Sequence, residues 1–132
     1  IDGTKGWCYA EASLNTVSVS KPILTTDVAN KWPLYVQYVA GYISSIWDST
    51  NVTTAPATNS IKYATEWGAP TLLAAAGGSV GSASGAFSNM TPTSLLYVGR
   101  DSVGSFYAFG SIKNLRIGQR ALSSSELQAV TA

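Results

Sequence analysis

The final third of the chain, residues 95–132, limits the possible folds more than any other segment. It contains an apolar run ending at Gly99, a loop with several glycines, a second strand-like run from Phe109 to Ile117 and a helical pattern at the end. Antiparallel sandwiches close with this order of elements. The segment therefore predicts an all-β architecture with one short C-terminal helix.

Short β-rich runs separated by glycine, proline and Asn/Ser clusters also fill the rest of the chain. Such spacing is typical of two-sheet sandwiches. The runs that we expect to be strands are Trp7–Leu14, Pro22–Thr26, Leu34–Val39, Tyr42–Trp47, Ile61–Trp67, Leu72–Ala76, Val80–Phe87, Leu95–Gly99 and Phe109–Ile117. The run 34–47 carries bulky residues on both faces, which predicts a central hairpin. The polar stretch Asp48–Asn59, which contains Pro56, is expected to be a loop.

The helix at the end has a specific start signal. Ser123 followed by Glu126 matches a capping box, in which the serine side chain accepts from the Glu126 amide and the glutamate reaches back. Leu122 is expected to pack on Leu127, with Val130 continuing the same helical face. We expect two helical turns covering one end of the sandwich.

The composition predicts one folded domain spanning residues 1–132. The chain is 45% apolar and 11% charged, with a net charge of +1, so it has ample apolar surface for a core. Its basic residues are scattered, which gives no support to nucleic acid as a partner. No run of eighteen apolar residues occurs, so membrane insertion is not expected. The chain begins at Ile1 and not at Met, and we expect a fragment of a longer protein.

Cys8 is the only cysteine, and histidine is absent. An intrachain disulfide is therefore impossible, and Cys8, between Trp7 and Tyr9, is expected to be a small buried residue on a strand. The absence of histidine removes the commonest general base and the commonest zinc ligand.

Several motifs resemble those of laminin G-like, concanavalin A-like jelly rolls found in bacteriophage tail fibres and tailspikes. Residues 95–132 are similar to the closing segment of these domains, and Gly6–Glu11 resembles their opening "G-x-x-Y-A-E" strand. Residues 60–64 resemble a central strand of that family. The chain departs from the family at 74–78, where Ala-Ala-Ala-Gly-Gly replaces a bulkier strand and an Asn-Gly turn.

The resemblance implies a concanavalin A-like jelly roll at the C-terminus of a phage fibre protein. The function then expected is recognition of a host cell-surface polysaccharide, without catalysis, in a homotrimer formed through the parent fibre. The expected location is the virion tail, assembled in the host cytoplasm, where one unpaired cysteine is compatible with reducing conditions. Two alternatives remain open, which are a structural cap that stabilises the trimer without a ligand and a carbohydrate-binding module of a secreted bacterial glycanase.

The sequence does not predict an enzyme, a metal site or a cofactor. Glycosidases generally use two carboxylates at a fixed separation, and those on related jelly rolls carry closely spaced acids on one strand, whereas Glu11 has no acidic partner two or five residues away. No G-x-S-x-G motif occurs. Asp27, Asp48 and Asp101 could each give calcium an oxygen, but they lie far apart in the sequence.

Sugar binding is the chemical hypothesis that the residues favour. Aromatic faces stack on the C–H patches of sugars, while amides, carboxylates and hydroxyls bond to the ring hydroxyls. The chain contains four Trp, seven Tyr and three Phe residues, and several stand beside polar residues at strand ends. The candidate ligand-binding residues are Trp47, Asp48, Asn51, Glu66, Trp67, Arg100, Asp101 and Tyr107.

Each group of candidates has a structural alternative. Trp47 and Trp67 could close the ends of the core, and Arg100 and Asp101 could form an ion pair that fixes their loop. The sequence alone does not separate these alternatives.

Overall fold

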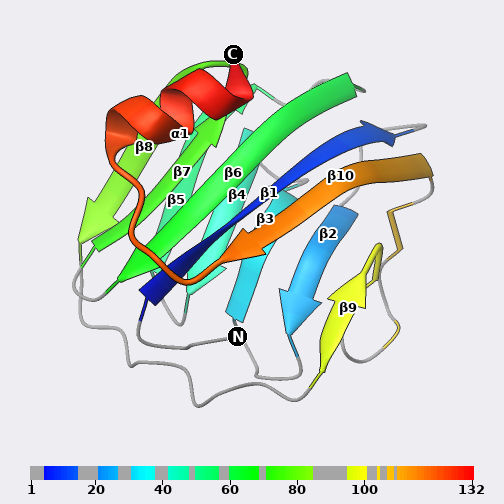
Figure 1. The fold of residues 1–132 in the computed structure, drawn as a ribbon. Coiled ribbons are helices and arrows are strands. Elements are labelled where there is room, and N and C mark those ends of the chain that lie inside the picture. The colour runs from blue at the N-terminus through cyan, green and yellow to red at the C-terminus, as the bar shows by residue number, and fades with distance from the viewer. Residues whose placement is uncertain are drawn as a thin grey trace.

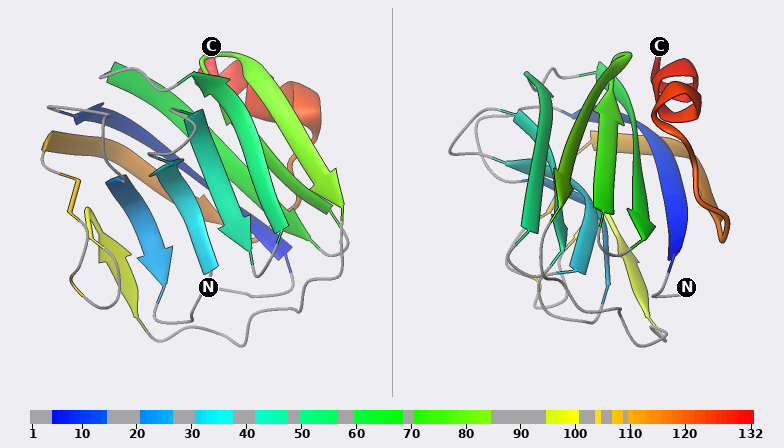
Figure 2. Two further views of the ribbon diagram at one scale, coloured as in Figure 1. Left: turned by 180° about the vertical axis from the view of Figure 1, so that it is seen from behind. Right: turned by 90° about the vertical axis from the view of Figure 1, so that its left-hand side faces the viewer.

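In the part of the chain that the structure describes, two antiparallel sheets of five strands each face one another, and one helix lies outside one of them (Figure 1, Figure 2). The computed structural model describes residues 5–14, 21–26, 31–37, 42–47, 50–56, 60–68, 71–84, 95–100, 104, 107–108 and 110–132. The arrangement confirms the predicted all-β jelly-roll sandwich with a short C-terminal helix.

Each sheet combines strands that are distant in sequence. Sheet A contains, in spatial order, β10 (Gly110–Gly118), β1 (Lys5–Leu14), β6 (Ser60–Gly68), β7 (Thr71–Ala76) and β8 (Ser79–Ser84). Sheet B contains β5 (Thr50–Pro56), β4 (Tyr42–Trp47), β3 (Lys31–Gln37), β2 (Lys21–Thr26) and β9 (Leu96–Val98). The first and last strands of the chain are neighbours in sheet A, so the closing segment completes the sandwich as the sequence predicted.

The strand order tests two expectations about individual segments. The hairpin of β3 and β4 has neighbours on both sides in sheet B, as expected. The expectation of a loop over 48–59 is wrong, because β5 pairs with β4 within it. Threonine and valine favour extended backbone, and Pro56 is compatible with the ladder because it ends an edge strand.

The interior between the sheets is built from one face of β1 and one face of β6. Cys8, Ala10, Ala12 and Leu14 alternate along β1 and are all buried, which confirms the prediction for Cys8. Burial raises the pKa of the Cys8 thiol well above its usual range, so the thiol is unreactive at neutral pH.

The opposite face of sheet A is covered by the helix α1 (Ser124–Thr131). Leu122 and Leu127 pack there in one buried cluster with Tyr9, Ala64 and Ala75. The predicted contact between Leu122 and the helix is thus confirmed. The helix lies over this outer face (Figure 1), where it contacts β6, β7 and β8. The helix was expected to cover one end of the sandwich, but it covers the outer face of sheet A instead.

Val130 does not follow the prediction. It is 43% exposed, and Thr131 takes the buried position at the end of α1. The Thr131 hydroxyl donates to the carbonyl of Leu127 at 2.9 Å and accepts from the amide of Gly78. A polar residue is therefore buried there with its hydrogen bonds made, as burial requires.

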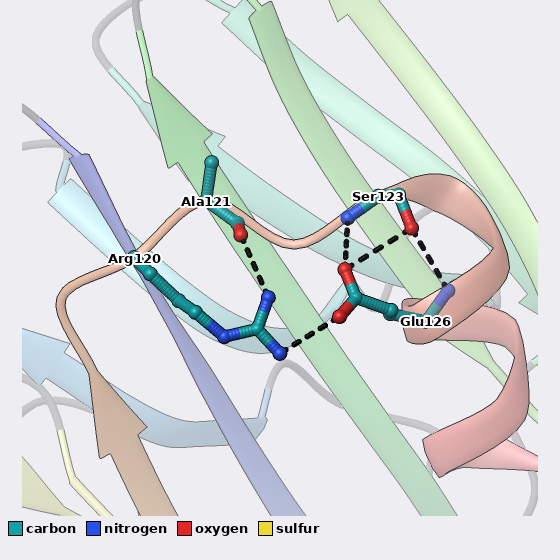
Figure 3. A network of polar contacts seen from close by, with 4 residues as sticks. All are labelled: Arg120, Ala121, Ser123 and Glu126. Atoms are coloured by element: carbon teal, nitrogen blue, oxygen red, sulfur yellow. Dashed lines mark hydrogen bonds and ion pairs between the residues drawn. The ribbon is translucent and has the colours of Figure 1, made fainter.

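The predicted capping box is present at the start of α1 (Figure 3). The Ser123 amide donates to Glu126 Oε2 at 2.8 Å, and the Glu126 amide donates to Ser123 Oγ at 3.3 Å. Arg120 adds a contact that the sequence did not predict, an ion pair to Glu126 Oε1 at 2.7 Å. Arg120 and the Ser123 hydrogen bonds lower the pKa of Glu126 to about 2. The box and the ion pair together fix the direction in which the chain enters the helix.

In the part of the chain that the structure describes, no helix has the length and apolar character needed to cross a membrane.

Replacing Ser123 with Ala should lower the free energy of unfolding by about 1 kcal/mol, because the first-turn amide loses its acceptor. Urea denaturation measures this change. Ser125→Ala is the matched control, since this exposed serine of the first turn lies outside the capping box. Equal stability of the two variants would contradict a stabilising cap.

Replacing Tyr63 with Phe should leave the free energy of unfolding unchanged or raise it by about 1 kcal/mol. The Tyr63 side chain is fully buried, and its hydroxyl has no hydrogen-bond partner among the described residues. The native state therefore carries the cost of a desolvated hydroxyl, which phenylalanine removes. A loss of more than about 1 kcal/mol on denaturation would show that the hydroxyl is satisfied.

Candidate ligand-binding site

The structure separates the predicted site residues into three places. Trp47 and Asn51 belong to the hairpin of β4 and β5, where Trp47 pairs with Thr50 and Asn51 with Ile46. Arg100 and Tyr107 lie beyond β9, at the opposite edge of sheet B. The third pair, on β6, belongs to the other sheet. Asp48 and Asp101 lie outside the described residues.

Glu66 and Trp67 are buried, and their assignment as ligand contacts is corrected. Trp67 is 1% exposed and Glu66 is 6% exposed. The Trp67 ring lies against Gly6, where an added Cβ would come within 2.9 Å of Trp67 Cε2. The ring therefore fills the interior beside a glycine that leaves room for it, which is the structural alternative.

Glu66 is buried on the other face of sheet A. Its neighbours across the strands are Trp7 on β1 and Leu73 on β7, and both pack against the apolar cluster beneath α1. Burial raises the pKa of this carboxyl to about 7, because an apolar environment disfavours the charged form. The side chain belongs to the packing under the helix and is not available as an acceptor for a sugar.

The structure brings Arg100 and Tyr107 together. They face one another as an isolated antiparallel bridge, and the backbone around them is fixed by hydrogen bonds to β2. The Gly99 amide donates to the carbonyl of Ile23 at 3.0 Å, and the buried Thr25 hydroxyl donates to the carbonyl of Arg100 at 2.8 Å. The ladder of sheet B thus continues past β9 and sets the position from which the Arg100 side chain starts.

The Arg100 side chain lies over an aromatic ring. Its guanidinium carbon is 4.6 Å from the centre of the Tyr97 ring, a distance typical of cation–π contacts. Among the described residues, no carboxylate forms an ion pair with Arg100. Tyr107 is 44% exposed beside it, and Gly104, at φ +73°, leaves room for the Tyr107 hydroxyl.

This arrangement is suited to a ligand whose ring carries a carboxylate and has an apolar C–H face. A guanidinium that lies over an aromatic ring can keep N–H groups for two parallel hydrogen bonds to a carboxylate. An exposed tyrosine beside it offers a ring face for the C–H groups of a sugar. Arg100, Tyr97 and Tyr107 therefore form the candidate site.

Tyr97 was missed in the sequence. It follows two leucines in an apolar run that was assigned to a strand, and nothing in that run marks its aromatic residue as a partner for an arginine. The available signal was its spacing, since Tyr97 and Arg100 flank a glycine that turns the chain at φ +75°.

The expected absence of a metal site stays a prediction. In the described ranges, no three Cys, Asp or Glu side chains converge as a metal site would require. The calcium candidates Asp27, Asp48 and Asp101 all lie outside those ranges, so this part of the prediction is untested.

Solved structures of sialidase modules share this fold. The CBM40 carbohydrate-binding module of the Ruminococcus gnavus IT-sialidase, bound to α2,3-sialyllactose, superposes with a TM-score of 0.72 at 18% identity over 98% of this chain and 83% of that chain. The same module bound to α2,6-sialyllactose gives 0.70 at 17% identity, over 98% of this chain and 84% of that chain. No protein-family model and no curated protein sequence matches the chain.

A leech enzyme contains the same fold as one part of a larger chain. The leech intramolecular trans-sialidase, complexed with 2,7-anhydro-Neu5Ac, gives a TM-score of 0.69 at 16% identity. The match covers 98% of this chain but 23% of the enzyme. At such identities the likeness establishes a shared β-sandwich fold.

The burial of Glu66 predicts a pH-dependent stability. The folded pKa of about 7 exceeds the ordinary value of 4.5, so the folded state holds this proton more tightly than the unfolded chain does. The free energy of unfolding should therefore fall as the pH rises from about 5 to about 8. Urea denaturation at both ends of that range should show a smaller fall in Glu66→Gln, and an equal fall in both proteins would contradict the assignment.

Proposed function

We propose that this chain is a non-catalytic carbohydrate-binding module that recognises an acidic glycan at Arg100, Tyr97 and Tyr107. The observation that carries the proposal is the Arg100 guanidinium, 4.6 Å above the Tyr97 ring and beside the exposed Tyr107. A carboxylate-bearing sugar offers both complements, an anion for the arginine and a C–H face for the tyrosine.

The fold supports this chemistry by analogy. The R. gnavus modules with the same fold are bound to sialyllactose, a trisaccharide whose terminal sugar carries a carboxylate. Fold likeness alone does not transfer a ligand. The proposal therefore rests on the arginine–tyrosine geometry, and the neighbours supply the class of glycan with which to test it.

The comparisons favour one of the alternatives left open by the sequence. The solved structures that share the fold come from sialidases. We therefore propose that this chain serves as a module of a secreted bacterial glycanase. The comparisons give no support to a phage tail fibre, a homotrimer or a host cell-surface partner, and these stay predictions of the resemblance. The expected virion location is untested.

Calorimetric titration with 3′-sialyllactose, 6′-sialyllactose and lactose tests the function. The two acidic sugars should bind and lactose should bind at least about tenfold more weakly, because it lacks the carboxylate that Arg100 pairs with. Arg100→Ala should weaken the acidic sugars about tenfold, and Arg100→Lys should be intermediate, since lysine keeps the charge but loses the two parallel hydrogen bonds.

Lys5→Ala is the control for loss of one positive charge. This exposed lysine lies at the start of β1 in the other sheet, and its removal should leave the affinity unchanged. Unaltered binding by a folded Arg100→Ala variant would refute the site, and equal affinity for lactose and the acidic sugars would refute recognition of the acid.

A further inference from the structure

A second recess lies on the outer face of sheet A, away from the Arg100 site. It has a volume of about 170 Å³ and is lined by Trp7, Tyr9, Arg116 and Val130. This is well above the roughly 10–15 Å³ that one water molecule needs on the same measure, so the recess has room for a small ligand such as one sugar ring. The exposure of Val130, which contradicted the helical prediction, is explained by its place at this recess.

The wall formed by Trp7 depends on a glycine in the neighbouring strand. Trp7 pairs with Gly118 across β1 and β10, and a Cβ at position 118 would come within 2.6 Å of Trp7 Cε2. The indole ring therefore lies against the backbone of Gly118, and Trp7 stays partly exposed. The exposed part of the ring borders the recess, where a sugar can stack on it.

A β-bulge places the cation of the recess. The register of β10 against β1 shifts between Tyr9 and Glu11, so that Lys113 pairs with Glu11 and Arg116 pairs with Tyr9. Lys113 and Arg116 are three residues apart, and the bulge directs both to the same face of the sheet. In a regular strand, residues three apart point to opposite faces. Asn114, at φ +53°, takes the left-handed conformation inside the bulge.

The acidic residue nearest to Tyr9 is already neutralised. Glu11 accepts hydrogen bonds from the Tyr9 hydroxyl at 2.9 Å and from Asn114 Nδ2 at 2.8 Å, and it forms an ion pair with Lys113 at 3.5 Å. Arg116 lies with its guanidinium carbon 5.9 Å from the centre of the Tyr9 ring. Among the described residues, Arg116 has no carboxylate partner of its own.

We propose that this recess is a second binding site, specific for a single pyranose ring that carries a carboxylate. The C–H face of the sugar would stack on Trp7, and the carboxylate would pair with Arg116, while Tyr9 closes the floor and the hydroxyls on the open side stay in water. Few polar groups converge there, so the affinity is weak. The proposal stands on its own residues and does not rest on the Arg100 site.

Nuclear magnetic resonance titration of the ¹⁵N-labelled protein with methyl β-D-glucuronide tests the site, and methyl β-D-glucoside is the matched neutral sugar. The glucuronide should shift the Trp7 indole and the backbone amides of Tyr9, Arg116 and Gly118. The neutral sugar should need about tenfold more ligand for the same shifts. Equal responses to both sugars, or no shift at these residues, would overturn the proposal.

Variants separate the two parts of the recess. Arg116→Gln should remove the preference for the acid and leave the weak response to the neutral sugar, because Trp7 is intact. Gly118→Ala should displace the indole and weaken both sugars, and Trp7→Ala gives the same readout if the glycine variant does not fold. Preference for the acid that persists in folded Arg116→Gln would refute the role of Arg116.

Arg100→Ala tests whether the Trp7 recess binds independently of the Arg100 site. It should leave the glucuronide shifts at Trp7 and Arg116 unchanged. Glucuronide shifts confined to Arg100 and Tyr107 would refute the second site while supporting the first. Shifts confined to the Trp7 recess would support the second site and show that the glucuronide does not bind at Arg100. Each proposal can therefore fail without the other.

Discussion

Sheet A must be buried on both of its faces, and much of the structure follows from that constraint. The residues from Tyr63 to Trp67 on β6 are all buried, so this strand shows none of the alternation between buried and exposed positions expected of a one-sided sheet. Sheet B covers one face. The other face is closed by Leu122 and Leu127, which the capping box and the Arg120–Glu126 ion pair hold in position. The helix is thus an integral part of the core, although it is short.

Two tryptophans in sheet A are accommodated by the same device on opposite faces. Trp67 lies against Gly6 in the interior, and Trp7 lies against Gly118 on the outside. In both cases a large ring occupies the space above a neighbouring strand that a side chain would otherwise fill. The two rings differ in exposure because different elements cover them. Sheet B covers Trp67, which is buried, whereas Trp7 lies at the border of the helix and remains partly exposed.

Features that depend on residues close in the chain could be predicted from the sequence. The Ser123 capping box is the clearest case, because its two members lie three residues apart. Burial of Glu66 was not predicted, because the cover over its face of β6 comes from a helix much later in the chain. Trp67 lies on the opposite face, where it takes the structural alternative left open by the sequence. Trp7, Tyr9 and Glu11 alternate along β1, so the sequence predicts that they share one face of the sheet. Which cations of β10 lie beside them depends on a bulge in that strand.

The distribution of positive charge explains why two places on this surface suit an anion. In a chain with 11% charged residues, most of the cations whose contacts are described have oxygen partners. Arg120 pairs with Glu126, Lys113 pairs with Glu11, and Lys62 donates to the carbonyl of Ala132 at 2.9 Å. Arg100 and Arg116 instead lie over tyrosine rings. An aromatic partner orients a guanidinium without neutralising it or occupying its N–H groups, so both arginines keep the capacity to bind a carboxylate from solution.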